Sequence, residues 1–344
     1  MDARPSPEQR QLEEAADRLA LKLGPSSVGD LDDADRRERL DAALAQAGWR
    51  ELRTGTPTEA AASGVEAAIV ARALARRACD TAFIGPLLAH DLLRRAGGPA
   101  DSVARTIAVT TDLQRLTVAD GSAVTSAQLA IDVAGSSSAV LLTAIDGRYR
   151  LAEAALGAPT EGVDLTRPVA NITPGTAITA FADTGTLSVD DITAWTALAV
   201  TLTAADLVGS MEGALVLATE YAKERRQYGA PIGSYQAVQH MLAEAATLTE
   251  GAVSAMIHAA WAVDALSPDA ARAAAAVAKA YASRAAITVC ETAIQVHGGI
   301  GNTWECMAHV YLRRTLLATE LFGGDGPQLM LLAQQRWGAT HGLS

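Results

Sequence analysis

The sequence predicts an α+β fold that is mostly α, with an N-terminal helical domain, a small middle β domain and a C-terminal four-helix bundle. Three observations predict it. Alanine is abundant and hydrophobic residues form 49% of the 344-residue chain, which favours closely packed helices. Helical periodicity marks both ends of the chain, whereas short β-branched runs between Gly and Asp mark the middle. The expected domains are 1–102, 103–190 and 191–344.

The N-terminal part carries helix signals separated by breaks. Pro7 and Glu8 begin a run whose apolar residues, such as Leu12 and Leu19, recur at helical spacing. A Phe-Ile-Gly-Pro stretch at 83–86 predicts a break, and Gly97 begins the closing turn. Further helices are expected at 36–49, 60–77 and 87–95.

The middle part alternates β-branched runs with turn residues. Asp146 and Gly147 lie between two such runs, a pattern typical of a β-hairpin. The sequence therefore predicts a small all-β unit with a hairpin at that point. Strands are expected at 103–111, 126–133, 139–144 and 177–181.

The C-terminal part returns to long helices with short connections. Pro268 separates two of them, and Gly298 and Gly323 follow helix ends as capping residues. Short connections favour antiparallel neighbours, so a four-helix bundle is expected. Its helices are predicted at 192–221, 236–266, 270–296 and 307–321.

Composition narrows the functional classes. A net charge of -11 argues against a nucleic-acid-binding protein, although a bound phosphate needs only one or two local arginines. Cys79, Cys290 and Cys306 have no metal or redox spacing, which favours a reducing compartment. We find no apolar signal segment at the N-terminus and no charge-free run of 18 apolar residues. We therefore expect a cytoplasmic protein without a membrane span or a metal site.

Two motifs in the C-terminal part are specific when taken together. The first is YAKERRQYGAPIGSYQ at 221–236, and the second is QVHGGIG at 295–301, followed by Arg313 and Arg314. They resemble the Y-x-x-x-R-x-x-F-G-x-x-(I/L)-x-x-x-Q and Q-x-x-G-G-x-G patterns of the acyl-CoA dehydrogenase family. Taken singly, an arginine pair indicates a solvated face and a double glycine a helix cap. Only the two blocks in register carry the resemblance, which covers residues 190–335.

The resemblance implies FAD as cofactor. In this family both motifs belong to one subunit and hold the FAD that is seated mainly on a neighbouring subunit, so an oligomer is implied. Arg225 offers a permanently charged planar fork to a pyrophosphate, and Gln295 can bond adenosine groups. Glycines let the backbone approach a ligand, whereas His297 is expected to be a packed or capping histidine. The candidate FAD-binding residues are Arg225, Tyr228, Gln236, Gln295, Gly298, Gly299 and Gly301.

The catalytic base that the resemblance implies is missing. The family removes the α-proton of an acyl-CoA thioester with a carboxylate and transfers the β-hydrogen to the flavin as hydride. The two positions at which the family places this base correspond here to Phe322 and Ala199, and neither side chain can accept a proton. The flavin-holding T-E-P-x-A-G-S-D motif is also absent at 110–115. Unconventional candidates for the base are Glu305, Glu320 and Asp325.

This pattern resembles the short, base-lacking subunit of heteromeric (α2β2-type) actinobacterial acyl-CoA dehydrogenases. The resemblance implies α,β-desaturation of an acyl-CoA thioester, including steroid side-chain CoA esters. It also implies a paralogous partner subunit and an electron-transfer flavoprotein as acceptor. Three alternatives stay open: a self-sufficient dehydrogenase with a displaced Glu base, a catalytically dead acyl-CoA-binding or scaffold protein, and a flavin-dependent monooxygenase on the same fold.

Overall fold

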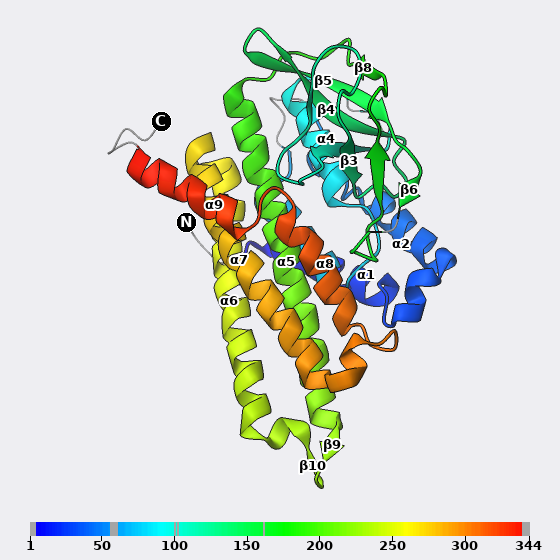
Figure 1. The fold of residues 1–344 in the computed structure, drawn as a ribbon, viewed down its shortest axis with the longest axis vertical. Coiled ribbons are helices and arrows are strands. Elements are labelled where there is room, and N and C mark those ends of the chain that lie inside the picture. Colours follow the sequence, from blue (N-terminus) through cyan, green and yellow to red (C-terminus); the bar gives the residue numbers. More distant parts are fainter. Residues whose placement is uncertain (1–4, 56–60, 100, 102, 161, 339–344) are drawn as a thin grey trace.

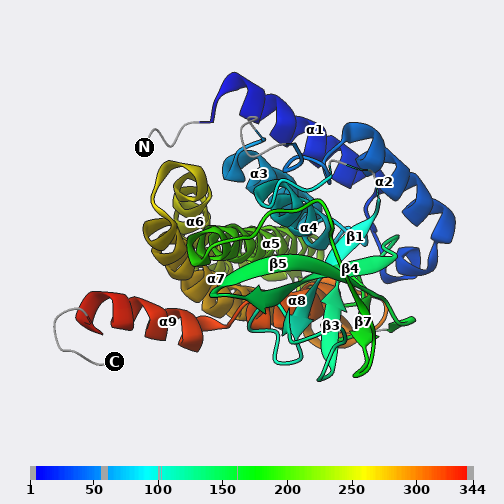
Figure 2. The same ribbon diagram turned by 90° about the horizontal axis from the view of Figure 1, so that it is seen from above.

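The computed structural model describes residues 5–55, 61–99, 101, 103–160 and 162–338. It confirms the predicted fold class, because helices at both ends of the chain flank a curled β-sheet (Figure 1). The sheet lies over one end of the long C-terminal helices, and the N-terminal helices pack along one side of them (Figure 2).

The N-terminal part holds four α-helices in the described residues. Capping boxes fix two of their starts: Ser6 pairs with Gln9, and Ser63 with Glu66. The predicted helix at 60–77 therefore begins only after Ser63, and residue 60 lies outside the described part. The elements are α1 (Pro7–Leu23), η1 (Val28–Asp32), α2 (Ala34–Ala47), α3 (Gly64–Arg76) and α4 (Ile84–Arg95).

The expected break at 83–86 is wrong, because α4 already begins at Ile84. Pro86 lies in the first turn, where a missing N–H removes no helical hydrogen bond. The buried Asp132 carboxylate, which follows a strand of the sheet, accepts hydrogen bonds from the N–H groups of Phe83 (2.8 Å) and Gly85 (3.1 Å). A distant side chain thus caps α4, and local sequence could not indicate that.

The middle part is an eight-stranded sheet ordered β6-β7-β3-β1-β4-β5-β8, with β2 also paired to β4. The predicted hairpin is confirmed: Asp146 and Gly147, both at positive φ, connect β4 to β5. The expected runs at 126–133 and 177–181 contain β3 and β8, whereas β2, β6 and β7 were missed and β5 was expected only as the second arm of the hairpin. The strands are β1 (Arg105–Thr110), β2 (Val118–Ala119), β3 (Gln128–Ile131), β4 (Ser138–Ile145), β5 (Arg148–Ala155), β6 (Pro159–Thr160), β7 (Val169–Ile172) and β8 (Ile178–Ala180).

The C-terminal part contains the four predicted long helices. Helix α5 lies at the centre, in contact with α3, α6, α7 and α8. Among the described residues it is the single helix long and apolar enough to cross a membrane, and 78% of its most apolar window is buried inside the protein, which accounts for that composition. The helices are α5 (Val189–Glu224), α6 (Gln236–Ala265), α7 (Pro268–His297) and α8 (Ala308–Glu320).

Short elements connect and extend these helices. Strands β9 (Arg226–Gln227) and β10 (Ala230–Pro231) form a hairpin, which η2 (Ile232–Ser234) joins to α6. The turn η3 (Gly298–Asn302) joins α7 to α8. A further helix that we did not predict, α9 (Asp325–Ala333), continues into η4 (Gln334–Gly338) and projects from the bundle (Figure 2).

Candidate functional site

The two motif segments meet at the end of the bundle that lies away from the sheet (Figure 1). The last turn of α5 contributes Tyr221, whose ring stacks on His297 at the end of α7 with 4.3 Å between ring centroids. His297 is buried, and its Nδ1 bonds the Ala293 carbonyl oxygen at 2.7 Å. This histidine is therefore packed, as expected, and it fastens the two motifs to each other.

Arg225 occupies the C-cap of α5 with its side chain in solvent. Its backbone is fixed, because its N–H donates to the Tyr221 carbonyl (2.8 Å) and its carbonyl accepts from the Ile232 N–H (2.7 Å). Its guanidinium makes no hydrogen bond or ion pair within the described residues, although other arginines of the chain are paired. A fixed backbone with a free cationic fork fits a pyrophosphate that approaches from outside.

The glycines of the second motif have two different roles. Gly298 caps α7 with φ +67°, and Cβ atoms built on Gly298 and Gly299 meet nothing within 4 Å. Both are exposed, so their backbone is open to a ligand. Gly301 is buried instead, and a Cβ there would lie 2.8 Å from the Ile294 carbonyl oxygen. Gly301 therefore shapes the turn, and its predicted contact with a ligand stays a prediction.

The remaining predicted residues lie on the same open surface. Tyr228 is 95% exposed at the tip of the β9–β10 hairpin, and Gln236 and Gln295 are exposed on α6 and α7. The hairpin is braced by Tyr235, whose hydroxyl donates to the Gln227 carbonyl at 2.9 Å. All three predicted side chains are open to solvent. FAD fits here if a second subunit supplies the other wall.

Sequence reasoning missed a groove directly after the glycine motif. Trp304 is 64% exposed, and the Arg313 guanidinium lies over its ring at 5.6 Å. His309 meets the same ring edge-on at 5.1 Å, and Asn302 completes the wall. The sequence feature that could have indicated this groove is a tryptophan in a polar loop beside the motif.

The position predicted for the base, Phe322, is closed by aromatic packing. Phe322 is only 3% exposed and meets Trp195 edge-on, with 5.8 Å between ring centroids. Trp195 is itself buried on α5, and its indole N–H donates to the Leu88 carbonyl at 3.0 Å. Phe322 has φ +59°, a left-handed backbone conformation that is rare for a bulky residue. Its neighbours therefore hold this ring firmly in place.

The loop at 110–115 helps to close the same place. The Leu113 carbonyl accepts the Phe322 N–H at 2.7 Å, and a Cβ built on Gly323 would lie 3.1 Å from the Gln114 Oε1. On the other side, Gln328 Nε2 donates to the carbonyls of Phe322 (2.7 Å) and Gly323 (3.1 Å). The loop that lacks the flavin-holding motif thus packs against the loop that lacks the base.

The other base candidates do not replace it. Ala199 is fully buried in α5, and its carbonyl accepts the Thr203 hydroxyl at 2.8 Å. Glu305 is exposed and precedes α8, whereas Phe322 follows it; a 13-residue helix separates them by about 20 Å. Glu320 is exposed, and Asp325 pairs with Arg284 at 2.5 Å. The candidates predicted from the sequence are therefore scattered and do not surround one reacting atom.

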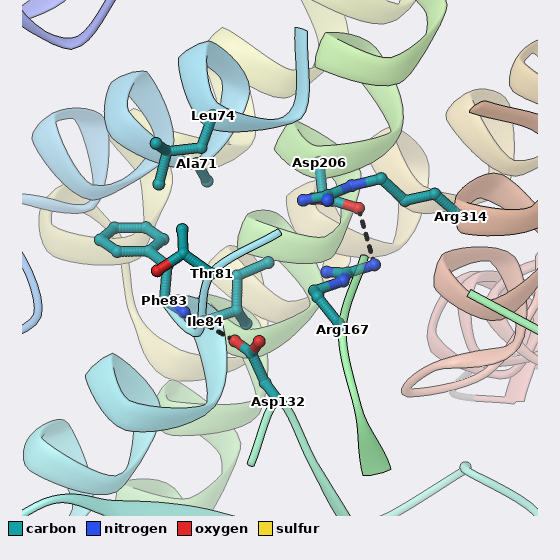
Figure 3. Close-up of a pocket in the computed structure, with 9 residues that line it drawn as sticks. All are labelled: Ala71, Leu74, Thr81, Phe83, Ile84, Asp132, Arg167, Asp206 and Arg314. Atoms are coloured by element: carbon teal, nitrogen blue, oxygen red, sulfur yellow. Dashed lines mark hydrogen bonds and ion pairs between the residues drawn. The ribbon is translucent and has the colours of Figure 1, made fainter. Parts of the chain in front are cut away.

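A buried charge network lies between the N-terminal helices, the sheet and the bundle (Figure 3). Arg314 of α8 donates to Asp206 of α5 at 2.6 Å and to the Cys79 carbonyl at 3.0 Å. Arg167 pairs with Asp164 at 2.8 Å and with Asp206 at 3.1 Å. The adjoining cavity measures about 10 Å³, room for about one water molecule. No acyl chain fits there.

Comparisons with known proteins agree with this architecture. Residues 197–336 match the model of the acyl-CoA dehydrogenase C-terminal domain. Acyl-CoA dehydrogenase IpdE2 of Mycobacterium tuberculosis is 32% identical over 346 residues, covering 96% of this chain and 98% of that protein. Among solved structures, the ChsE4-ChsE5 complex from M. tuberculosis (TM-score 0.79, 21% identity, 99% of both chains) shares the fold. The Tcur3481-Tcur3483 steroid ACAD does so too (TM-score 0.79, 21% identity, 96% of this chain and 98% of that one).

Proposed function

Because this chain belongs to the acyl-CoA dehydrogenase family, we propose that it is the base-lacking subunit of a heteromeric enzyme, which clamps FAD seated on a paralogous chain. One observation carries the proposal. The base position is plugged by the buried Phe322, whereas the guanidinium of Arg225 is exposed and unpaired within the described residues. The chain has kept a surface for the cofactor and has lost the machinery for proton abstraction.

FAD is the cofactor of this family, and when bound it accepts the β-hydrogen of the acyl-CoA thioester as hydride. In the proposed assembly, Arg225 pairs with the pyrophosphate charge of the FAD on the neighbouring chain. Gln295 and the open backbone of Gly298 and Gly299 bind its adenosine end. The carboxylate that removes the α-proton belongs to the partner subunit, since no carboxylate in the described part of this chain lies at the base position.

The substrate is an acyl-CoA thioester, and we propose a steroid side-chain CoA ester. The likeness in fold to the Tcur3481-Tcur3483 steroid ACAD and to the ChsE4-ChsE5 complex supports this choice. The burial of Phe322 against Trp195 supports a shared site, because a bulky acyl group would then be held by the partner. Electron-transfer flavoprotein is the proposed acceptor.

The test is to purify the chain alone and then with its paralogue, recording native mass and visible absorption. We expect a colourless protein alone and a yellow, active mixed oligomer with the partner. In the mixed oligomer, Arg225→Ala should lower FAD affinity at least ~tenfold, because a charge-assisted bidentate contact is lost. Arg226→Ala is the matched control, an exposed neighbour at a variable position of the motif, and should leave the affinity unchanged.

Other outcomes would favour the alternatives. A chain that is yellow and active alone, with a full complement of FAD, would favour a self-sufficient dehydrogenase with a displaced base. If Arg225→Ala joins the paralogue as well as the wild type does, and the bound FAD is unchanged, the result would favour a scaffold whose arginine binds no ligand.

A further inference from the structure

A second candidate site lies at the opposite end of the bundle from the motif surface. It is a groove bordered by strand β5, the first turns of α5 and α7, and the end of α9, near the sheet (Figure 1). Its free volume is about 280 Å³, just below the range of about 300–1,000 Å³ typical of small-molecule sites. The groove shares no residue with the FAD surface, and its role does not depend on the proposed function.

The groove contains an arginine without an anion. Arg272 of α7 lines it, and its Nη1 is shielded from solvent and has no hydrogen-bond partner within the described residues. Burial lowers the pKa of Arg272 to about 10, and no neighbouring carboxylate in the described part of the chain offsets that effect. Other partly buried arginines are paired: Arg53 with Asp91, and Arg72 with Glu212. A partly buried cation left unpaired is costly, and an arriving anion relieves that cost.

The rest of the groove limits what that anion can be. Val189, Ile192 and Leu331 provide aliphatic walls, and Tyr149 adds an aromatic ring. Asp269, the other charged residue that lines the groove, is exposed and does not offset the effect of burial on Arg272. A highly charged phosphate ester would leave the aliphatic walls uncovered. A single carboxylate attached to an apolar chain satisfies both parts.

We propose that this groove binds a small monocarboxylate with an apolar chain of medium length. The carboxylate lies on the guanidinium of Arg272, whose planar fork matches two carboxylate oxygens. The chain lies along Val189, Ile192 and Leu331, where burial of methylene groups adds affinity with chain length.

Calorimetric titration of the full chain with acetate, butyrate, octanoate and octylamine tests the proposal. We expect saturable binding that strengthens from acetate to octanoate, and none of octylamine, whose ammonium is repelled by Arg272. Arg272→Gln should weaken octanoate binding at least ~tenfold. Arg284→Gln, which removes an exposed arginine of the same helix, should leave it unchanged.

Two results would overturn the proposal: no saturable octanoate binding at millimolar concentration, or equal binding by the wild type and Arg272→Gln. Thermal unfolding shows whether Arg272→Gln is folded. If it is not, Arg272→Lys keeps the charge without the planar fork, and should bind octanoate several-fold more weakly. If Arg225→Ala loses FAD binding but binds octanoate as the wild type does, the groove and the proposed FAD surface are independent sites.

Discussion

At the scale of one residue, Phe322 shows what occupies the position at which the sequence predicts the missing base. Once a carboxylate is absent, an aromatic ring at the same position can be buried against Trp195 without an unsatisfied charge. The positive φ of Phe322 keeps the backbone path of a tight loop, now closed by the Leu113 carbonyl and Gln328.

Restoring a carboxylate at this position should therefore fail to restore activity. We expect Phe322→Glu to lower the free energy of unfolding by about 3 kcal/mol, because a carboxyl would replace a ring packed in an apolar pocket. Urea unfolding measures the loss, and an acyl-CoA turnover assay of the isolated chain should stay at background. Measurable turnover by the isolated variant would contradict the closed site.

Lys279 gives the chain a stability that depends on pH. It is fully buried on α7 and donates to the carbonyls of Ala318 and Thr319 at the end of α8. Burial lowers the pKa of Lys279 to about 7, against the raising effect of Glu320 and Asp206. In the unfolded chain a lysine keeps a pKa of about 10.4.

The sign follows from proton counts. Between about pH 7 and pH 10.4 the unfolded chain holds the Lys279 proton and the folded chain does not, so stability from this group rises with pH. Below pH 7 both states are protonated and the contribution is flat. Urea unfolding of the wild type and of Lys279→Met at about pH 6, 8 and 9.5 spans this window. The free energy of unfolding should rise with pH in the wild type alone. Parallel pH profiles would refute the shift.

At the scale of elements, helix propensity and helix packing predict opposite effects of an alanine at Gly209. Glycine inside a helix is less favourable than alanine by about 1 kcal/mol, so propensity alone predicts that Gly209→Ala stabilises α5. In the structure a Cβ at Gly209 would lie 2.2 Å from the Arg72 carbonyl oxygen of α3. That oxygen belongs to a helix backbone and cannot move independently.

We therefore expect Gly209→Ala to destabilise the protein by about 2 kcal/mol or more, as overpacking does. The control is Gly299→Ala, where a Cβ meets nothing within 4 Å, and whose unfolding midpoint should stay close to wild type. Thermal and urea unfolding of both variants measures the difference. A stabilised Gly209→Ala would mean that α3 and α5 are farther apart than described.

The sequence predicted the long helices well because their signals are local. Capping residues and periodicity placed α1, α2, α5, α6, α7 and α8 within a few residues of their observed bounds. It failed where neighbours decide, as at the start of α4, which Asp132 caps from the sheet. Helix α9 was missed because its nine residues follow a double glycine and carry no clear periodicity.

In the candidate site, too, residues in local motifs could be predicted from the sequence, whereas contacts between distant residues could not. Arg225, Gln295 and the glycines could be found because motif spacing is local, and the structure places their segments together. The buried pairing of Arg314 with Asp206 could not be predicted, since the two residues are 108 positions apart and each resembles an ordinary surface charge in the sequence. The same holds for Arg272, whose lack of a partner in the described residues is visible only in three dimensions.

At the scale of the whole molecule, the cofactor surface and the closed base position lie at different ends of α8. Gly298 and Gly299 precede α8 in the chain, whereas Phe322 follows its end, and the 13-residue helix between them rises about 20 Å. In the proposed assembly each chain meets a neighbour's cofactor. A symmetric interface can place the FAD surface of one chain against the flavin-binding site of the other.

That arrangement fixes the amount of cofactor in the mixed oligomer. If this chain clamps FAD but seats none, each pair of unlike chains contains one complete site, formed by the partner's seat and this chain's clamp. We expect about one FAD per pair of chains, measured as flavin absorbance of the denatured complex against its native mass. Two FAD molecules per pair would mean that the loop at 110–115 rearranges on assembly to seat a flavin. Phe322 would then have to leave its contact with Trp195, and tryptophan fluorescence on mixing the subunits would report the change.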